Sequence, residues 1–287
     1  MKKIFFFAAS LLFLILFPIS EFNIICKNTV TPHNITIIAH RGASNLAPEN
    51  TLSAIKEAIK QKTRFIEIDV HLTKDNIPVV IHDYSIDRTT NGSGEIREKN
   101  YEELLQYDAG SWFDEKYKNE KIPTLEQIIK MVNGRANLIV EIKGSLNKYP
   151  EIVKQVNRII SENNATSWCT IHTFNNDILK EFANINPQIK LQKLVIFYIP
   201  YLNFYFDTAP HFNGSILNKI EAINIYYRFI NSCVVNFFHS KGIKVNAWTV
   251  NNISQIKKLK SLGVDGIITD ISDQVMPEIN KENPSVK

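Results

Sequence analysis

Eight short apolar runs, rich in β-branched residues, recur along the chain and alternate with longer stretches of helical spacing. Alternating strands and helices predict parallel strands joined by right-handed crossovers. Eight such units in about 245 residues match a (β/α)8 barrel, the TIM barrel, in number and size. An open, doubly wound sheet is the alternative. The expected strands are Ile35–Ala39, Phe65–Asp69, Leu138–Ile142, Cys169–His172, Leu191–Val195, Ala222–Tyr226, Lys244–Trp248 and Gly266–Thr269.

The stretches between these runs predict helices that each bury one face. Apolar residues recur about every 3.6 positions in Thr51–Gln61 and Leu125–Val132, and every third position in Ile253–Leu262. No stretch rich in Pro, Gly and Ser interrupts the pattern. We therefore expect one α/β domain, a single barrel, over residues 34–278.

A ninth apolar run, Pro78–Ile81, follows the second strand too closely for a parallel crossover, which needs a dozen or more residues. The connection is therefore expected to be a hairpin, with Asp75 and Asn76 as its two central residues. This turn predicts that Asp69 lies opposite His82. A slip of one residue would turn His82 to the other face of the ribbon.

The segment Tyr84–Lys121 is the longest interruption between strands. It holds two turn signals, Asn91-Gly92 and Ser93-Gly94, and then a short stretch of helical spacing, Tyr101–Tyr107. We expect a small insertion after the second-strand hairpin, lying over the barrel mouth.

Residues 1–25 differ in character from the rest of the chain. Lys2-Lys3 precede the apolar run Ile4–Ile19, a pattern typical of a secretory signal. The run is slightly shorter than the roughly 20 residues of a transmembrane helix, so a membrane anchor is the alternative. Either reading predicts a barrel that is exported, to the periplasm or the extracellular space, or anchored to a membrane. The formal net charge of +4 is too small to indicate a nucleic-acid partner.

Polar side chains gather where the first three strands and the hairpin end. In a (β/α)8 barrel the carboxyl ends of the strands form the catalytic face. We therefore expect these side chains to converge on one rim. They are His40, Arg41, Glu67, Asp69, His82, Glu141 and Lys143.

Three of these side chains are carboxylates that would repel one another inside the barrel. Glu67 and Asp69 are two residues apart on a strand and so share a face, and Glu141 follows on the next strand. One divalent cation, Mg²⁺ or Ca²⁺, would neutralise this set through oxygen ligands. The alternative is a structural ion-pair network with Arg41 and Lys143.

The histidines are the groups of this set that exchange protons near neutral pH. His40 and His82 beside a metal suggest an acid–base pair. His172 ends the expected fourth strand and is a further candidate for lining the site, whereas His71 and His239 are expected to be structural.

Fixed positive charge beside the presumed metal indicates a bound anion. Arg41 and Lys143 together would hold a phosphate, and Trp248 at the end of the seventh strand offers a flat wall for the organic part of a substrate. A core position for Trp248 is the alternative. Metal, phosphate clamp and two histidines together predict phosphoester cleavage.

The residues that carry these features also occur in short motifs that resemble the glycerophosphodiester phosphodiesterase family. The motifs are His40-Arg41-Gly42, Pro48–Thr51, Glu67–Val70, Leu72–Asp75, Pro78–Asp83, Arg88–Gly92, Ile122–Leu125, Glu141–Lys143, Trp248–Asn251 and Val264–Asp270. The resemblance implies a (β/α)8 barrel that hydrolyses glycerophosphodiesters to sn-glycerol 3-phosphate and an alcohol. It further implies that His40 and His82 are the acid–base pair, that Glu67, Asp69 and Glu141 bind the metal, and that Arg41 and Lys143 hold phosphate.

Two other functions use the same residues. The aromatic stretch Phe197–Phe206 favours a phospholipase, of lysophospholipase D or C type, that acts on lipids at a membrane surface; buried loop packing is the simpler explanation of that stretch. A module that binds phosphodiesters without cleaving them is the second alternative, although binding alone needs no proton carriers. The residues leave open the head group, the choice between Mg²⁺ and Ca²⁺, and which histidine is the acid.

Overall fold

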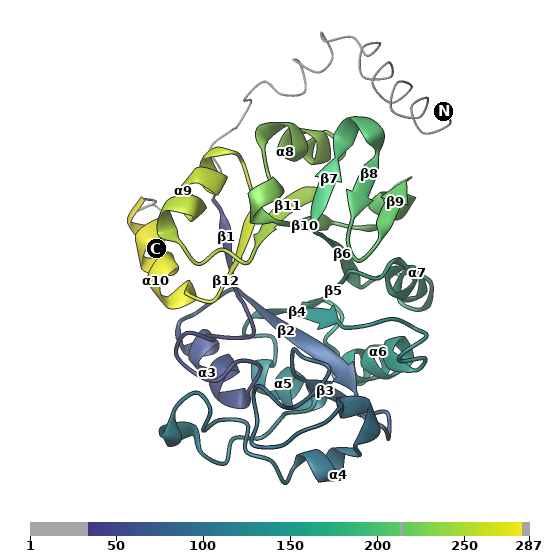
Figure 1. The fold of residues 1–287 in the computed structure, drawn as a ribbon. Coiled ribbons are helices and arrows are strands. Elements are labelled where there is room, and N and C mark those ends of the chain that lie inside the picture. The colour runs from purple at the N-terminus through teal and green to yellow at the C-terminus, as the bar shows by residue number, and fades with distance from the viewer. Residues whose placement is uncertain (1–33, 213–214, 283–287) are drawn as a thin grey trace, which may run out of the picture.

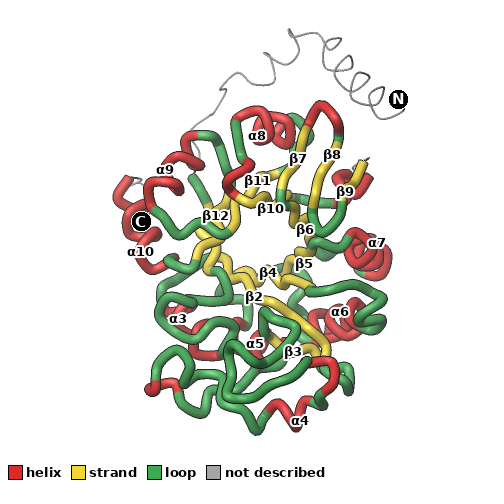
Figure 2. The backbone as a smooth tube through the Cα atoms, viewed as in Figure 1, coloured by secondary structure: helices red, strands yellow, loops and turns green. Residues whose placement is uncertain are grey.

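The computed structural model describes residues 34–212 and 215–282. Eight parallel strands of this part form a closed ring, with helices outside it (Figures 1 and 2). The ring runs β1-β12-β11-β10-β6-β5-β4-β2, and pairing of β1 with β2 closes it, which confirms the predicted (β/α)8 barrel. Its strands are β1 (Thr36–Ala39), β2 (Phe65–Leu72), β4 (Asn137–Ile142), β5 (Cys169–Thr173), β6 (Lys190–Val195), β10 (Ala222–Tyr226), β11 (Lys244–Trp248) and β12 (Gly266–Thr269).

The helices cover the outside of the ring with their apolar faces. Thr51 caps α3 by accepting a hydrogen bond from the Ala54 backbone, and Thr124 begins α5 in a capping box with Gln127. The helices are α3 (Leu52–Lys60), α5 (Leu125–Val132), α6 (Ile152–Glu162), α7 (Asn176–Ile185), α8 (Ser232–His239), α9 (Ile253–Ser261) and α10 (Ser272–Glu282).

Strand alternation decides which side chains of β2 reach the interior of the ring. Ile66, Ile68 and Val70 belong to the core between strands and helices. Glu67 and Asp69, at the alternate positions, therefore point into the barrel. The two-residue period of the strand therefore places both carboxylates on its inner face.

The hairpin from β2 into β3 (Pro78–Val80) has a different register from the predicted one. His71 pairs with Val79, and the Ile81 amide bonds the Asp69 carbonyl, so Asp69 lies opposite Ile81. The prediction was wrong because the loop has three residues, not two: Thr73 pairs with Ile77, and Asn76 takes a left-handed φ of 60°.

The insertion after β3 has a small apolar core of its own. The insertion contains η1 (Ile96–Glu98), α4 (Tyr101–Leu104) and η2 (Glu115–Tyr117). Figure 2 shows it beside the ring, next to β3, and not across the ring's opening, which corrects the predicted position over the mouth. The segment lies at the side because its core is built onto β3 and the residue after it. That core comprises Val79, Ile81, Ile86, Ile96, Leu104, Ala109 and Ile122.

The aromatic stretch after β6 forms a second, antiparallel sheet. It consists of β7 (Phe197–Ile199), β8 (Phe204–Phe206) and β9 (Pro210–Phe212), with η3 (Pro200–Leu202) between the first two. Tyr198 and Tyr205 are buried, and Tyr198 packs against Phe238 of α8, so part of this stretch is core. The remaining short helices are η4 (Ser215–Lys219) and η5 (Tyr227–Phe229).

A buried ion pair fastens this second sheet to the barrel. Lys193 of β6 is fully buried, and its ammonium lies 2.7 Å from Asp207, which follows β8. The same ammonium donates to the Phe174 carbonyl after β5.

The predicted signal or anchor, residues 1–25, lies outside the described residues. Across residues 34–212 and 215–282, no helix combines the length and the apolar character needed to cross a membrane.

Candidate active site

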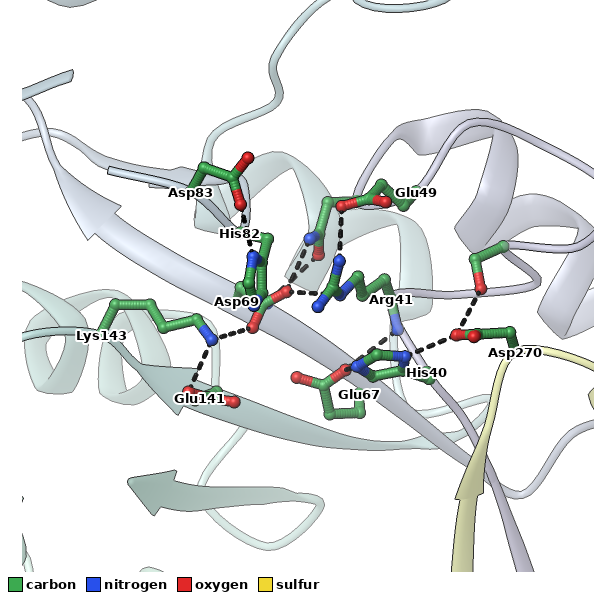
Figure 3. A network of polar contacts seen from close by, with 12 residues as sticks. His40, Arg41, Glu49, Glu67, Asp69, His82, Asp83, Glu141, Lys143 and Asp270 are labelled. Carbon is green, nitrogen blue, oxygen red and sulfur yellow. Dashed lines mark hydrogen bonds and ion pairs between the residues drawn. The ribbon is translucent and has the colours of Figure 1, made fainter. Parts of the chain in front are cut away.

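The seven predicted polar side chains meet at the carboxyl ends of β1, β2 and β4 and just after β3 (Figure 3). Six of them border a pocket of about 100 Å³, and Asp69 lies in the same polar network. The pocket is lined by His40, Arg41, Glu67, His82, Glu141, Lys143, His172, Phe174, Leu194, Trp248, Thr249 and Ile268.

A tight backbone turn after β1 presents His40 and Arg41 to the pocket. Arg41 and Gly42 both have positive φ, 57° and 85°. The Arg41 amide donates to Glu67 Oε2 at 3.0 Å, and the Gly42 amide donates to the Glu67 carbonyl at 3.2 Å. A Cβ at Gly42 would lie 2.8 Å from the backbone and Cβ of Ala54, so only glycine fits there.

Asp69 is held by two cations and an amide. Lys143 Nζ lies 2.9 Å from Oδ1, and Arg41 Nε lies 3.3 Å from Oδ2. Asn50 donates to Oδ2 at 2.8 Å. Burial alone would raise the pKa of Asp69, but Lys143 and Arg41 hold it well below its usual value, so this carboxylate is charged.

Glu67, Glu141 and His172 form the group that could hold a metal. One ligand atom from each lies within 4.8 Å of the other two, and all three residues are buried. Burial and the Asp69 and Glu141 carboxylates raise the pKa of Glu67 well above its usual value. Glu67 Oε1 is buried and has no hydrogen-bond partner among the described residues. A buried carboxylate with an unused oxygen fits a cation.

Glu141 contacts a lysine ammonium through one carboxylate oxygen and a histidine ring through the other. Lys143 Nζ lies 2.7 Å from Oε1, and His172 Nε2 lies 3.4 Å from Oε2. Burial would raise the pKa of Glu141, but Lys143 and then His172 lower it to about 2. Glu141 is therefore an anion at neutral pH.

Each predicted catalytic histidine is oriented by a carboxylate on Nδ1. His40 Nδ1 lies 2.6 Å from Asp270, and His82 Nδ1 lies 2.6 Å from Asp83. Asp270 also accepts from Ser44 at 3.3 Å. With Nδ1 engaged, Nε2 is the nitrogen left for proton exchange, as in a triad in which a carboxylate fixes the tautomer.

His82 is also fixed through its backbone. His71 Nε2 lies 3.0 Å from the His82 carbonyl, and His71 Nδ1 lies 3.1 Å from the Tyr149 hydroxyl. Because a carbonyl only accepts, His71 Nε2 carries a proton. Burial lowers the pKa of His71 to about 4, so it is neutral and structural, as predicted.

Arg88 connects the two halves of the site. Its guanidinium bonds both oxygens of Glu49, at 2.7 and 3.0 Å, and Asp83 at 2.7 Å. Glu49 in turn accepts from Arg41 Nη1 at 2.8 Å. A chain of charged contacts therefore runs from His82 to Arg41.

The other wall of the pocket is apolar. Phe174 meets Trp248 edge to face with ring centres 5.7 Å apart, and the ring centres of Tyr226 and Trp248 lie 5.5 Å apart. Trp248 thus lines the pocket as predicted.

The sequence reasoning assigned no role to five residues that hold the site together. All five stand in the quoted motifs, but a position in a motif does not say which partner a side chain contacts. His172 was a candidate, and the structure places it in the pocket wall. The five are Glu49, Asn50, Asp83, Arg88 and Asp270.

Comparison with known proteins agrees with this geometry. The model of the glycerophosphoryl diester phosphodiesterase family matches residues 40–274. The chain belongs to this family. It is 34% identical to a glycerophosphodiester phosphodiesterase of Bacillus altitudinis over 84% of this chain and 96% of that one. It is 32% identical to one of Caldanaerobacter subterraneus subsp. tengcongensis, over 85% and 98%.

The solved structure of a phosphodiesterase is similar to this chain over most of its length. An Oleispira antarctica phosphodiesterase, in complex with the product sn-glycerol-3-phosphate, has a TM-score of 0.76 and 28% identity. The alignment covers 85% of this chain and 96% of that one.

Proposed function

We propose that the chain hydrolyses glycerophosphodiesters to sn-glycerol 3-phosphate and an alcohol, with His40 and His82 as the acid–base pair. One observation carries the proposal: two histidines, each with Nδ1 on a carboxylate, face one pocket that also holds carboxylates and two cationic side chains. The relatives named above, and the product bound to the Oleispira antarctica phosphodiesterase, support this substrate class.

Arg41 and Lys143 supply the fixed positive charge for a phosphodiester. Both are held in place by acids, Arg41 by Glu49 and Lys143 by Glu141. Side chains positioned in this way orient a phosphate before reaction without further ordering. Trp248 and Phe174 form the surface for the organic part of the substrate.

The histidines move the protons. One accepts the proton of the attacking hydroxyl at Nε2, and the other donates a proton to the oxygen of the departing alcohol as its bond to phosphorus breaks. If water attacks, the products form directly. If a hydroxyl of the substrate attacks, a cyclic phosphate forms first, and ³¹P NMR during turnover distinguishes the two routes.

The carboxylates support a divalent cation. Glu67 and Glu141 fit one, His172 adjoins them, and the role of Asp69 as a ligand stays a prediction. Such a cation would stabilise negative charge on the phosphoryl oxygens. EDTA should abolish activity, and one added divalent ion should restore it.

The decisive assay follows glycerol 3-phosphate release from glycerophosphocholine by wild type, His40→Ala and His82→Ala. We expect each variant to lose about 10²–10⁴-fold in kcat. His239→Ala, on the outer helix α8, is the matched control and should keep wild-type activity. Full activity in either pocket variant would remove that histidine from the mechanism.

Lysophosphatidylcholine in the same assay tests the phospholipase alternative, which the named relatives do not favour. Faster turnover of the lysolipid would replace the proposed substrate.

We also propose that residues 1–25 direct export of the barrel, either cleaved or retained as an anchor. Cell fractionation and N-terminal sequencing of the mature protein test this. A full-length chain in the cytosol would contradict it.

A further inference from the structure

His172 stands in the same inward-facing layer as two of the carboxylates. It pairs in register with Glu141 on the neighbouring strand, which pairs with Asp69 on the next. Side chains at these paired positions emerge on the same side of the sheet. This layer is buried, because His172 is 1% exposed. Glu67, which lies two residues before Asp69 on β2, is also 1% exposed.

The spacing of three ligand atoms suits one small cation. Atoms from Glu67, Glu141 and His172 lie within 4.8 Å of one another. Nitrogen and oxygen ligands about 2.0–2.2 Å from a tetrahedral Zn²⁺ lie about 3.3–3.6 Å apart, so the three ligand atoms would have to move together by about 1.5 Å at most. Glu67 Oε1, buried and unpartnered within the described chain, is an oxygen ready for such a contact.

The contacts of Asp69 and His172 are unequal. Asp69 is held by Lys143, Arg41 and Asn50 at 2.8–3.3 Å. If Asp69 bound the cation, it would have to give up these contacts or share its oxygens between them and the metal. His172 Nε2 has only the Glu141 contact among the described residues, and its 3.4 Å is long for a hydrogen bond.

The tautomer needed for metal binding is also accessible. A histidine that ligates through Nε2 carries its proton on Nδ1. His172 Nδ1 has no partner in the described part of the chain, so nothing there opposes a proton on Nδ1. A proton on Nε2 is favoured only by the long 3.4 Å contact with the Glu141 carboxylate, and a bound cation would replace that contact.

We propose that His172 supplies an imidazole nitrogen to the divalent cation of this site, beside Glu67 and Glu141. A site with one nitrogen and two carboxylate ligands favours Zn²⁺ and similar cations more strongly than a site of oxygen ligands does. This differs from the Mg²⁺ or Ca²⁺ expected from three carboxylates. The inference rests on the proposed function only in requiring that a divalent cation binds here.

The first test measures the ligand atom directly. Metal-free protein is loaded with Mn²⁺, and pulsed electron paramagnetic resonance records coupling to ¹⁴N. We expect a ¹⁴N coupling that persists in the His40→Gln/His82→Gln double variant, because His172 is then the one imidazole left among the pocket-lining residues described above. Loss of the coupling in that variant would overturn the proposal, whether or not any substitution of His172 folds.

The second test compares metals by isothermal titration calorimetry. His172→Gln should weaken Zn²⁺ binding by about tenfold or more, while Ca²⁺ binding changes less than about threefold. His239→Gln is the control and should change neither affinity. Equal losses for both ions, or none, would show that His172 is no ligand.

These readouts are independent of turnover. A nitrogen-coordinated metal in a protein that leaves glycerophosphocholine intact would refute the proposed function alone. Hydrolysis by a protein whose metal shows no ¹⁴N coupling would refute the His172 assignment alone.

Discussion

Arg88 offers a sharp test of how the site is held together. It lies in the insertion beside the barrel, yet its guanidinium bonds Asp83, which orients His82, and Glu49, which holds Arg41. Arg88→Lys keeps the charge but replaces a planar fork with a single ammonium. One ammonium cannot reproduce the four contacts that Arg88 makes to the two carboxylates.

The expected effects on stability and on catalysis differ widely. The Arg88 side chain is 43% exposed, so its ion pairs contribute at most about 1 kcal/mol to the free energy of unfolding. A displacement of about 1 Å at a catalytic group can cost about 10²-fold in rate. We expect kcat to fall about 10- to 100-fold, a loss of roughly 1.4–2.7 kcal/mol of transition-state stabilisation.

Steady-state kinetics on glycerophosphocholine and a urea denaturation curve for each variant give the two quantities. Arg97→Lys is the matched control, because Arg97 lies in the same insertion and its ion pair is with Glu95, two residues away in the chain. A double-mutant cycle of Arg88→Lys with Asp83→Asn should be strongly non-additive. A kcat within twofold of wild type, or a stability loss large enough to explain the rate, would refute the reasoning.

Two further predictions concern structure. Asp207→Leu leaves the buried Lys193 ammonium without its counter-ion and should lower the free energy of unfolding by about 3–5 kcal/mol. Adding Lys193→Met to this variant should recover most of the lost stability. Urea denaturation measures both effects, and a loss below about 1 kcal/mol for Asp207→Leu would contradict the prediction. Gly42→Ala places a Cβ 2.8 Å from Ala54 at a φ of 85°, so it should cost about 1–3 kcal/mol and raise KM by displacing Arg41; an unchanged melting temperature and KM would contradict this.

The barrel could be predicted because each strand carries its own signal. Short β-branched runs between helical stretches determine the number of strands, and strand ends determine which side chains share a rim. The hairpin register could not be predicted in the same way. Asp75-Asn76 suggests a two-residue turn, but the Thr73 side chain bonds Asp75 and Ile77 and so stabilises a three-residue loop.

His82 reaches the pocket despite the wrong register. It lies beyond the last bonded pair of the ribbon, so strand alternation no longer fixes its direction. His71 and Asp83 fix it instead.

The partners of the histidines show where sequence reasoning ends. His40 and Asp270 are 230 residues apart, and their contact exists because β12 is the neighbour of β1 in the closed ring. Alternation and spacing predict which residues face the interior, but the shape of the loops decides which two touch. Long-range pairs of this kind follow from the folded ring and have no local pattern.

The Glu67 side chain takes part both in the site and in the closure of the barrel. β1 and β2 pair over only two positions, Ile38 with Phe65 and Ala39 with Ile66. Beyond them the ladder is replaced by bonds from the Arg41 and Gly42 amides to Glu67, one to its side chain and one to its backbone. The Glu67 carboxylate, which is suited to a cation, therefore also helps to join β1 to β2 where the barrel closes. A substitution of Glu67 that changes metal affinity would also remove the side-chain acceptor of the Arg41 amide at this junction.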